Sequence, residues 1–398
     1  MRKQQYIFLA LIMGISLVSC SEKNDPQPAP VTPVIMIDNA SVTRTTTAGT
    51  MHFTVTLNKT TTVPVMVDYL LVDGSAIAPR DYTAASGTIT IPANQTTAGL
   101  DVAIKGDPTD TRQNNLQFTV SLSNARNGAL GVLGSNGTII TEDGTNFVTD
   151  NTGYSTPLTY PGYTLTWSDE FAGSSLNLAN WNQETGNNGG WGNNELEYYT
   201  SSPKNYLVSN GNLIIEARKE EIGSQHYSSG RMTSQGKRTF TFGRIDIRAK
   251  LPVAKGMWPA LWMLGANIST VPWPGCGETD IMELIGTNPS RVYGTAHWKR
   301  LDGAHDSKGS QYDLAGANFS QQFHVFSLIW TTDQMKWLID DQLYLTVVKA
   351  DVGTSNYPFN LASFLIMNVA VGGDWPGPPD ATTIFPQRMI VDYVRVFQ

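Results

Sequence analysis

Short runs in which apolar and polar residues alternate recur along almost the whole chain of 398 residues. Examples are MHFTVTLNKT from Met51, GTITI from Gly87, LQFTVSL from Leu116 and FGRIDIRAKLP from Phe242. Successive side chains of a strand point to opposite faces, so a period of two predicts strands with one buried face. Helical periodicity is nearly absent. The sequence therefore predicts an all-β protein.

Charge and length limit the classes of partner. The net charge is −7, only 15% of the residues are charged, and basic residues form no cluster. The electrostatic field that draws proteins to phosphate backbones is therefore missing, and we expect no nucleic-acid partner. The chain is long enough for two or three separately packed domains.

The first 33 residues indicate export rather than folding. Arg2 and Lys3 precede an apolar run that is too short to span a bilayer but fits a secretory signal. The run ends in Leu-Val-Ser before Cys20, which resembles a bacterial lipobox. We expect a signal peptide over 1–19, a lipid anchor on Cys20 as the only membrane attachment, and a Pro-rich tether over 20–33. The alternative is an ordinary cleaved signal in which Cys20 is incidental. The expected location is that of an exported bacterial lipoprotein, at the outer membrane or cell surface.

Residues 34–143 hold several alternating runs separated by turn residues, which predicts a β-sandwich of roughly seven strands. The segments VDYLLVDGSAIAPRDYTAASGTITI from Val67 and LQFTVSLSNARNGALG from Leu116 resemble the Calx-β module, an immunoglobulin-like sandwich that often binds calcium. The acidic opening of that module is replaced here by ASVT from Ala40, which argues against calcium. We interpret the module as a spacer, or less strongly as a carbohydrate-binding accessory.

A Gly-, Thr- and Asn-rich segment, 144–162, predicts a linker, and the region 163–398 predicts a large antiparallel sandwich. Within it, GCGETDIMELIG from Gly275 carries the carboxylates of Glu278, Asp280 and Glu283. On a regular strand the first two share a face and Glu283 points to the other. A β-bulge at residues 281–282 returns Glu283 to the same face, so we expect a bulged strand.

Three crowded carboxylates among apolar neighbours have pKa values that are pushed apart, leaving one ionised and another protonated near neutral pH. Retaining glycoside hydrolysis needs that pair: an ionised nucleophile and a protonated acid. Two alternatives remain open from spacing alone. The strand face could be simply solvated, or Glu278, Asp280 and His297 could bind a metal.

Tryptophans favour the hydrolytic interpretation. Sugar C–H faces stack on aromatic rings, and a low net charge suits a neutral polysaccharide. The central and late parts of this region contain five tryptophans: Trp258, Trp262, Trp273, Trp298 and Trp375.

These motifs resemble glycoside hydrolase family 16, in its laminarinase-like bacterial branch. The resemblance rests on FTFGRIDIRAKLP from Phe240, GMWPALWMLG from Gly256, GETDIMELIG from Gly277, GTAHW from Gly294, NVAVGGDWPG from Asn368 and MIVDYVRVF from Met389. It implies a concanavalin A-like β-jelly-roll with a glucan cleft and retaining endo-hydrolysis. It also implies roles: Glu278 as nucleophile, Glu283 as general acid and then base, and Asp280 as the residue that orients the nucleophile.

The resemblance implies substrate contacts as well, and no cofactor for catalysis. To these contacts we add Trp273 of the tryptophan group. The expected substrate-binding residues are Asn193, Asp246, Arg248, Trp258, Trp262, Trp273, His297, Trp298 and Asn368. Family members frequently hold one structural Ca²⁺, and the matching positions here are Glu170, Gly211 and Asp392, through carbonyl oxygens and the Asp carboxylate.

We expect a β-1,3-glucanase that acts on laminarin and that could extend to mixed β-1,3/1,4-glucan, and we expect a monomer. One alternative is a hydrolase of a marine galactan such as agar, porphyran or carrageenan. Another is a non-catalytic glucan-binding surface protein, although such proteins lack one or more of the three carboxylates.

Overall fold

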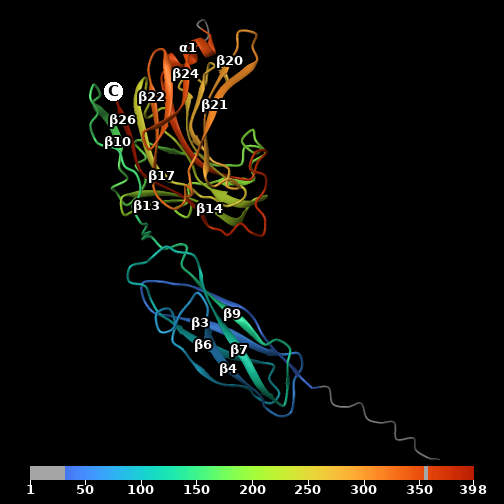
Figure 1. Cartoon of the computed structure of the whole chain (residues 1–398). Coiled ribbons are helices and arrows are strands. Elements are labelled where there is room, and N and C mark those ends of the chain that lie inside the picture. Colours follow the sequence, from blue (N-terminus) through green and yellow to red (C-terminus); the bar gives the residue numbers. More distant parts are fainter. Residues whose placement is uncertain (1–31, 354–356) are drawn as a thin grey trace, which may run out of the picture.

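The computed structural model describes residues 32–353 and 357–398. The expected signal peptide, Cys20 and nearly all of the tether lie outside the described residues. Two β-sandwiches follow one another along the chain (Figure 1). Among the residues that the structure describes, no helix is long and apolar enough to cross a bilayer.

The N-terminal sandwich packs a four-stranded sheet, in the order β6-β3-β1-β8, on a five-stranded sheet, in the order β2-β9-β7-β4-β5. Its strands are β1 (Val34–Ile37), β2 (Ala40–Thr43), β3 (Gly49–Leu57), β4 (Val65–Asp73), β5 (Ser86–Ile91), β6 (Thr97–Ile104), β7 (Leu116–Arg126), β8 (Ala129–Leu130) and β9 (Gly134–Ile140). The sandwich has nine strands where about seven were expected, partly because the first extended segment is split into β1 and β2, which belong to different sheets. β1 pairs with β3 and β8, whereas β2, two residues later, pairs with β9.

The C-terminal sandwich is a β-jelly-roll of two large sheets. The ten-stranded sheet has the order β12-β15-β14-β26-β17-β22-β23-β24, with β10 beside β26 and β13 beside β14. Its strands are β10 (Leu165–Asp169), β12 (Glu197–Tyr199), β13 (Tyr206–Ser209), β14 (Asn212–Ile222), β15 (Gln225–Ser229), β17 (Gly243–Lys250), β22 (His324–Trp330), β23 (Gln334–Ile339), β24 (Gln342–Val348) and β26 (Gln387–Phe397).

The seven-stranded sheet has the order β11-β16-β25-β18-β19-β20-β21 and carries the carboxylates. Its strands are β11 (Asn182–Gln183), β16 (Arg231–Thr233), β18 (Met257–Gly265), β19 (Glu278–Glu283), β20 (Arg291–Lys299), β21 (His305–Asp313) and β25 (Ser363–Val371). Within 32–353 and 357–398, helix is confined to the short α1 (Lys349–Val352) and the 3-10 turn η1 (Pro358–Asn360). The predicted all-β class is confirmed.

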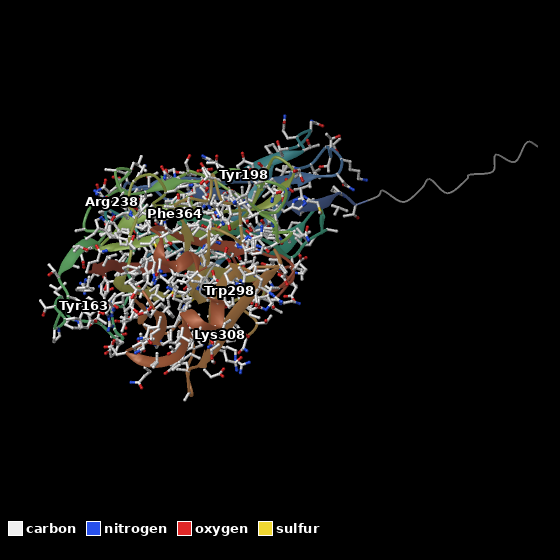
Figure 2. All side chains as sticks on the ribbon, turned by 90° about the horizontal axis from the view of Figure 1, so that it is seen from above. Tyr163, Tyr198, Arg238, Trp298, Lys308 and Phe364 are labelled. Atoms are coloured by element: carbon white, nitrogen blue, oxygen red, sulfur yellow. The ribbon has the colours of Figure 1, made fainter. Side chains whose placement is uncertain are left out.

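The core of the jelly roll lies between its two sheets, and side chains fill that space (Figure 2). Trp337 of β23 is fully buried there, and its indole Nε1 donates a hydrogen bond of 2.8 Å to the backbone carbonyl of Asp280. Gly294 of β20 makes room for this ring, because a Cβ at that position would lie 2.7 Å from Trp337 Cδ1. One tryptophan thereby ties the two sheets together at the carboxylate-bearing strand.

A buried ion cluster joins the two sandwiches. Glu216 of β14 is fully buried, and it accepts hydrogen bonds from Arg218 Nε at 2.7 Å and from Arg388 Nε at 2.6 Å. Arg112 of the N-terminal module places its Nη1 3.6 Å from Glu216 Oε2 and donates to the carbonyls of Pro203 and Lys204. A buried charge that loses its partner is costly, so these contacts hold the modules together.

Replacing Arg112 with alanine should loosen the junction between the two sandwiches. We expect the change to weaken their association by about 3 kcal/mol, because it deletes one partner of a buried ionic cluster. Small-angle scattering should show a larger maximum dimension, and limited proteolysis should cut faster within 144–162. Arg126→Ala, which removes an ion pair with Asp68 on the surface of the same module, is the matched control. Equal behaviour of the two variants would contradict the interpretation.

Candidate active site

A β-bulge in β19 gathers the three carboxylates. Residue pairing with β20 joins Glu278 to His297 and Asp280 to Thr295, then shifts so that Glu283 opposes Tyr293. The pairing with β18 shifts at the same place. The extra residue turns both Ile281 and Met282 into the core. The predicted bulge is confirmed, and Glu278, Asp280 and Glu283 all line one cavity.

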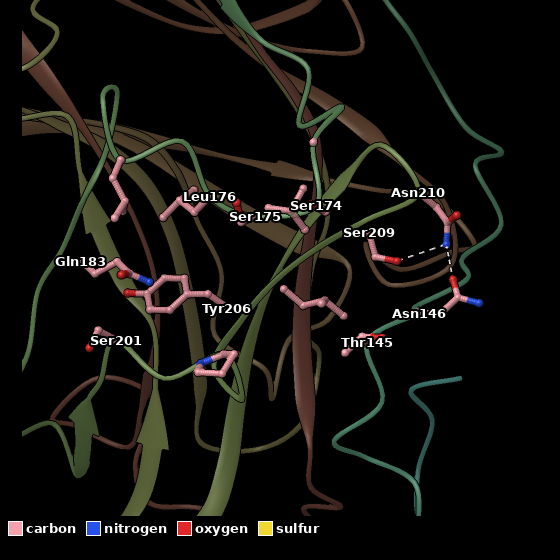
Figure 3. A pocket seen from close by; sticks show the side chains of 15 residues that line it. Thr145, Asn146, Ser174, Ser175, Leu176, Gln183, Ser201, Tyr206, Ser209 and Asn210 are labelled. Carbon is pink, nitrogen blue, oxygen red and sulfur yellow. Dashed lines mark hydrogen bonds between the residues drawn. The ribbon is translucent and has the colours of Figure 1, made fainter. Parts of the chain in front are cut away.

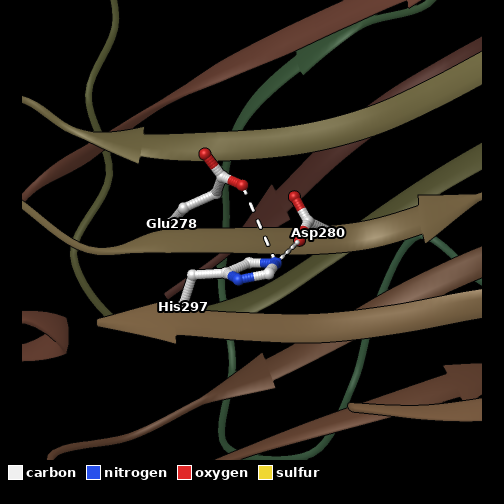
Figure 4. Close-up of side chains that lie close together, drawn as sticks. All are labelled: Glu278, Asp280 and His297. Atoms are coloured by element: carbon white, nitrogen blue, oxygen red, sulfur yellow. Dashed lines mark ion pairs between the residues drawn. The ribbon is translucent and has the colours of Figure 1, made fainter. Parts of the chain in front are cut away.

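Each glutamate accepts one indole hydrogen bond. Trp273 Nε1 lies 3.1 Å from Glu278 Oε2, and Trp258 Nε1 lies 3.0 Å from Glu283 Oε1. His297 approaches from β20, with Nε2 at 3.0 Å from Asp280 Oδ2 and 3.8 Å from Glu278 Oε1 (Figure 4). The imidazole therefore faces the Glu278–Asp280 side of the cluster.

Burial dominates the electrostatics of these three groups. It raises the pKa of Glu283 to about 8, and the charge of Asp280 adds to the effect. Burial is also the main reason that the pKa of Glu278 is raised to about 8. The charge of Asp280 adds to this increase, and His297 opposes it. The pKa of Asp280 is about 8, again through burial. Low-dielectric surroundings thus favour retained protons at neutral pH, which is what a general acid requires.

The carboxylates open into a cleft of about 370 Å³ whose lining includes four tryptophans, Trp191, Trp258, Trp262 and Trp273. Trp273 and Trp375 are 47% and 41% exposed, so their indole faces are available to a ligand. Trp375 packs edge-on against Trp258, with ring centroids 5.6 Å apart, and against Tyr293 at 4.9 Å. Partly exposed indoles held in fixed orientations suit the apolar faces of sugar rings.

A chain of hydrogen bonds fixes the opposite wall. Trp262 Nε1 donates to Asn368 Oδ1 at 2.8 Å, and Asn368 Nδ2 donates to the hydroxyl of Tyr199 at 3.1 Å. That hydroxyl donates to Glu195 Oε2, and Asn193 Nδ2 donates to Glu195 Oε1, both at 3.1 Å. Segments far apart in sequence are joined in this way, so Trp262 is held in one orientation along the cleft.

Sequence reasoning missed Arg231, which lies at the same wall. Its guanidinium carbon stands 4.5 Å from the Trp191 ring and 4.8 Å from the Trp262 ring, and its Nε donates to Glu184 at 2.5 Å. A cation between two indoles is stabilised by electrostatic attraction to the negative faces of the rings. No spacing pattern marks Arg231, since its partners come from separate loops and strands. The half-buried Trp191 could have been found from the Gly- and Asn-rich loop around it.

Three expected substrate contacts are wrong. Asp246 and Arg248 lie on β17 in the ten-stranded sheet, away from the cleft, and both are buried. Asp246 accepts from Arg244, Tyr160 and Ser327, whereas Arg248 pairs with Asp392. Trp298 is buried in the core, because it is adjacent to the cleft-facing His297 and strand side chains alternate.

The remaining expected contacts stand in or beside the cleft. The cavity is lined by Asn193, Trp258, Trp262, Trp273 and Asn368 together with the carboxylates. His297 touches the carboxylates from the neighbouring strand. The structure therefore brings together six of the nine expected positions.

A second, larger hollow of about 600 Å³ lies beside the interdomain linker (Figure 3). Its walls include Thr145 and Asn146 of the linker and Tyr206, Ser209 and Asn210 of the jelly roll. No carboxylate, imidazole or basic side chain is among the residues described as lining it. Its chemistry is that of hydroxyl and amide groups, so it offers neither an acid nor a nucleophile.

A jelly roll whose tryptophan-lined cleft gathers three carboxylates on one strand has the architecture of a glycoside hydrolase. The sequence model of glycosyl hydrolases family 16 matches residues 194–395, and the chain belongs to this family. The model of the Calx-beta domain matches residues 31–145.

Relatives support the same assignment. The laminarinase catalytic domain from Thermotoga maritima has 48% sequence identity and a TM-score of 0.56, over 59% of this chain and 98% of that one. A beta-glucanase from Rhodothermus marinus is 41% identical over 60% of this chain and 86% of its own length. A glucan endo-1,3-beta-glucosidase A1 from Niallia circulans is 39% identical over 60% of this chain, which spans only 38% of that relative.

The raised pKa of Glu283 predicts a pH-dependent gain in stability for Glu283→Gln. A carboxyl whose folded pKa lies above its unfolded value costs stability as pH rises from about 4.5 to about 8. We expect almost no gain at pH 4 and a gain of up to about 4 kcal/mol at pH 8, since one pKa unit corresponds to about 1.4 kcal/mol and the shift spans about 3.5 units. Denaturant unfolding across this range measures it. Glu221→Gln, at an exposed glutamate, is the control, and a gain independent of pH would refute the burial argument.

Proposed function

We propose that this hydrolase cleaves β-1,3-glucan internally, with retention of configuration, and extends to mixed β-1,3/1,4-glucan. The observation that carries the proposal is the bulged strand that aims two glutamates, each hydrogen-bonded to an indole, into one tryptophan-lined cleft. Laminarinases and β-1,3-glucanases among the relatives support the choice of substrate.

In the proposed mechanism, Glu278 attacks the anomeric carbon while Glu283 donates its proton to the departing glycosidic oxygen. A glycosyl–enzyme ester forms on Glu278, and the leaving saccharide carries the proton away. Water then attacks the ester, Glu283 takes a proton from that water, and Glu278 is released as a carboxylate. Asp280 and His297 hold the nucleophile side of the cleft in place, since His297 contacts both carboxylates.

A neutral glucan fits the cleft better than a sulfated galactan. Arg231 is the one arginine or lysine among the residues described as lining the cavity. It is already engaged by Glu184 and by the rings of Trp191 and Trp262. A sulfate ester would need an available cationic donor, so the charge distribution argues against that class.

The test is product analysis on laminarin, lichenan, agarose and carrageenan. We expect oligosaccharides from laminarin, a β-anomer as first product by NMR, and a loss of kcat of about a thousandfold or more in both Glu278→Ser and Glu283→Gln. Azide should restore the ability of Glu278→Ser to cleave an aryl glycoside, because a small anion can occupy the space that the glutamate leaves. The product should be a glycosyl azide of inverted configuration. The rate of the unmodified enzyme should fall above about pH 8, where Glu283 loses its proton.

Glu221→Gln serves again as the control and should keep full activity. Release from agarose or carrageenan alone would refute the glucan proposal and leave the roles of the glutamates standing. Undiminished turnover in Glu278→Ser would refute the roles themselves. Binding of laminarin without any turnover would make the chain a glucan-binding protein instead.

We also propose a structural calcium site at Glu170, Gly211 and Asp392. β26 pairs with β14 up to Val391 and with β10 from Val394, so Asp392 lies where one ladder ends and the other begins. Gly211 precedes β14 and Glu170 follows β10, and this position of each beside the break supports the proposal. Carbonyl and carboxylate oxygens suit Ca²⁺, although Asp392 also pairs with Arg248 at 2.7 Å. Bound calcium would stabilise the fold and take no part in the chemistry.

Calcium should raise the midpoint of thermal unfolding by several degrees, and Asp392→Asn should remove most of that increase. Binding to the native state alone shifts stability by mass action, which is the reason for the expected rise. Scanning calorimetry with EGTA and with millimolar CaCl₂ measures the difference. Asp374→Asn at the cleft margin is the control variant, and an equal response in both variants would place calcium elsewhere.

We propose, finally, that the chain is exported and held at the membrane by a lipid on Cys20, with no other membrane contact. Support comes from the basic start, the apolar run and the small residues before Cys20. The Pro-rich residues that follow would separate both sandwiches from the bilayer.

A further inference from the structure

The cluster on which the reaction depends has the composition of a transition-metal site. Glu278, Asp280 and His297 each offer one ligand atom, and these atoms lie within 4.8 Å of one another. Figure 4 shows the imidazole and the two carboxylates converging from β20 and β19. One imidazole and two carboxylates form a ligand set that Zn²⁺ accepts at catalytic-type sites with an open fourth position.

Two of the three separations between the ligand atoms are close to those around a tetrahedral ion, and all three are within 4.8 Å. Bonds of about 2.0–2.2 Å in tetrahedral geometry place neighbouring ligand atoms about 3.3–3.6 Å apart. His297 Nε2 lies 3.0 Å from Asp280 Oδ2 and 3.8 Å from Glu278 Oε1, which brackets that value. Shifts of a few tenths of an ångström would equalise the two distances, and the cleft leaves the fourth position to water.

Two further observations point to a ligand at this place. Asp280 is only 3% exposed, yet its buried Oδ2 accepts no hydrogen bond of good geometry, although His297 Nε2 lies 3.0 Å away. His297 Nδ1 lies 2.9 Å from Nε2 of His305 on β21. When that contact uses the Nδ1 proton of a neutral His297, the lone pair of Nε2 faces the carboxylates. A hydrogen bond from the other ring nitrogen commonly orients a metal-binding histidine.

We propose that the cleft binds one Zn²⁺ ion through Glu278, Asp280 and His297 and that the ion competes with the polysaccharide. A coordinated Glu278 shares its lone pairs with the metal and cannot attack the anomeric carbon, so zinc reversibly inhibits the enzyme. The inhibition rests on the proposed function, whereas the binding does not. Two other histidines pair with acidic residues at the surface, His52 with Asp101 and His226 with Glu221, but each has only one such partner.

Titration calorimetry with ZnCl₂ on the calcium-saturated full chain tests the binding without substrate. We expect one site in the micromolar range that His297→Ala weakens about tenfold or more. His226→Ala, the control at a surface histidine, should keep that site. Co²⁺ in place of zinc should give the visible absorption of a four-coordinate ion, which His297→Ala abolishes. Unchanged binding in His297→Ala, or no binding to the unmodified chain, would overturn the proposal.

A laminarioligosaccharide bound in the cleft should compete with zinc. Saturating laminaritriose should weaken zinc binding to Glu283→Gln about tenfold, and a zinc-selective chelator should restore the activity of zinc-treated enzyme. Zinc binding that depends on His297 in a chain without glucanase activity would refute the proposed function alone. Glucanase activity with zinc binding that is indifferent to both His297→Ala and laminaritriose would refute the metal site alone.

Discussion

The bulge in β19 is the constraint on which the cleft depends. A regular strand would send Glu283 into the core and one of Ile281 and Met282 toward solvent, which would cost burial and separate the acid from the nucleophile. One additional residue satisfies both requirements, since Ile281 and Met282 are buried and the three carboxylates line one cavity. The Trp337 indole, which donates to the carbonyl of Asp280 from the opposite sheet, fastens the backbone at the point where regular pairing stops. Core packing and catalysis therefore share one element.

The sequence was informative where a local pattern determines the structure. Period-two runs predict strands, and the count of residues from Asp280 to Glu283 predicts the bulge without any knowledge of the fold.

The sequence was misleading where the surroundings of a residue depend on which sheet its strand joins. Asp246 and Arg248 have the polar character of a binding face, but β17 lies in the ten-stranded sheet, where buried ionic partners satisfy them. Trp298 fails for a simpler reason: alternation allows only one of two neighbours, His297, to face the cleft. Arg231 could not be found at all, because its environment is assembled from residues distant in sequence.

The junction between the sandwiches depends on buried charges, whereas the cleft depends on the bulge in β19. Glu216 is as fully buried as any residue of the core, but arginines surround it, and the carboxylates of Glu142 and Asp143 approach Arg218 from the end of the N-terminal module. Such a cluster contributes little net stability compared with apolar packing, yet it tolerates few alternative arrangements because every lost partner leaves a buried charge. A module with this attachment acts as a fixed extension of the jelly roll. That is consistent with a spacer, which must hold the cleft at a set distance and orientation.

The two glutamates of the cleft have similar surroundings, and the difference between their roles must come from a small asymmetry. Both are partly buried, burial raises the pKa of both to about 8, and each accepts one indole hydrogen bond. His297 breaks the symmetry, because its Nε2 lies 3.8 Å from Glu278 Oε1 and 3.0 Å from Asp280 Oδ2, on one side of the cluster. His297 opposes the rise in the pKa of Glu278, which favours the ionised carboxylate on that side, and the charge of Asp280 adds to the rise in the pKa of Glu283. Because the same imidazole in its neutral form exposes a lone pair to both carboxylates, the feature that separates nucleophile from acid also creates a place for a metal ion.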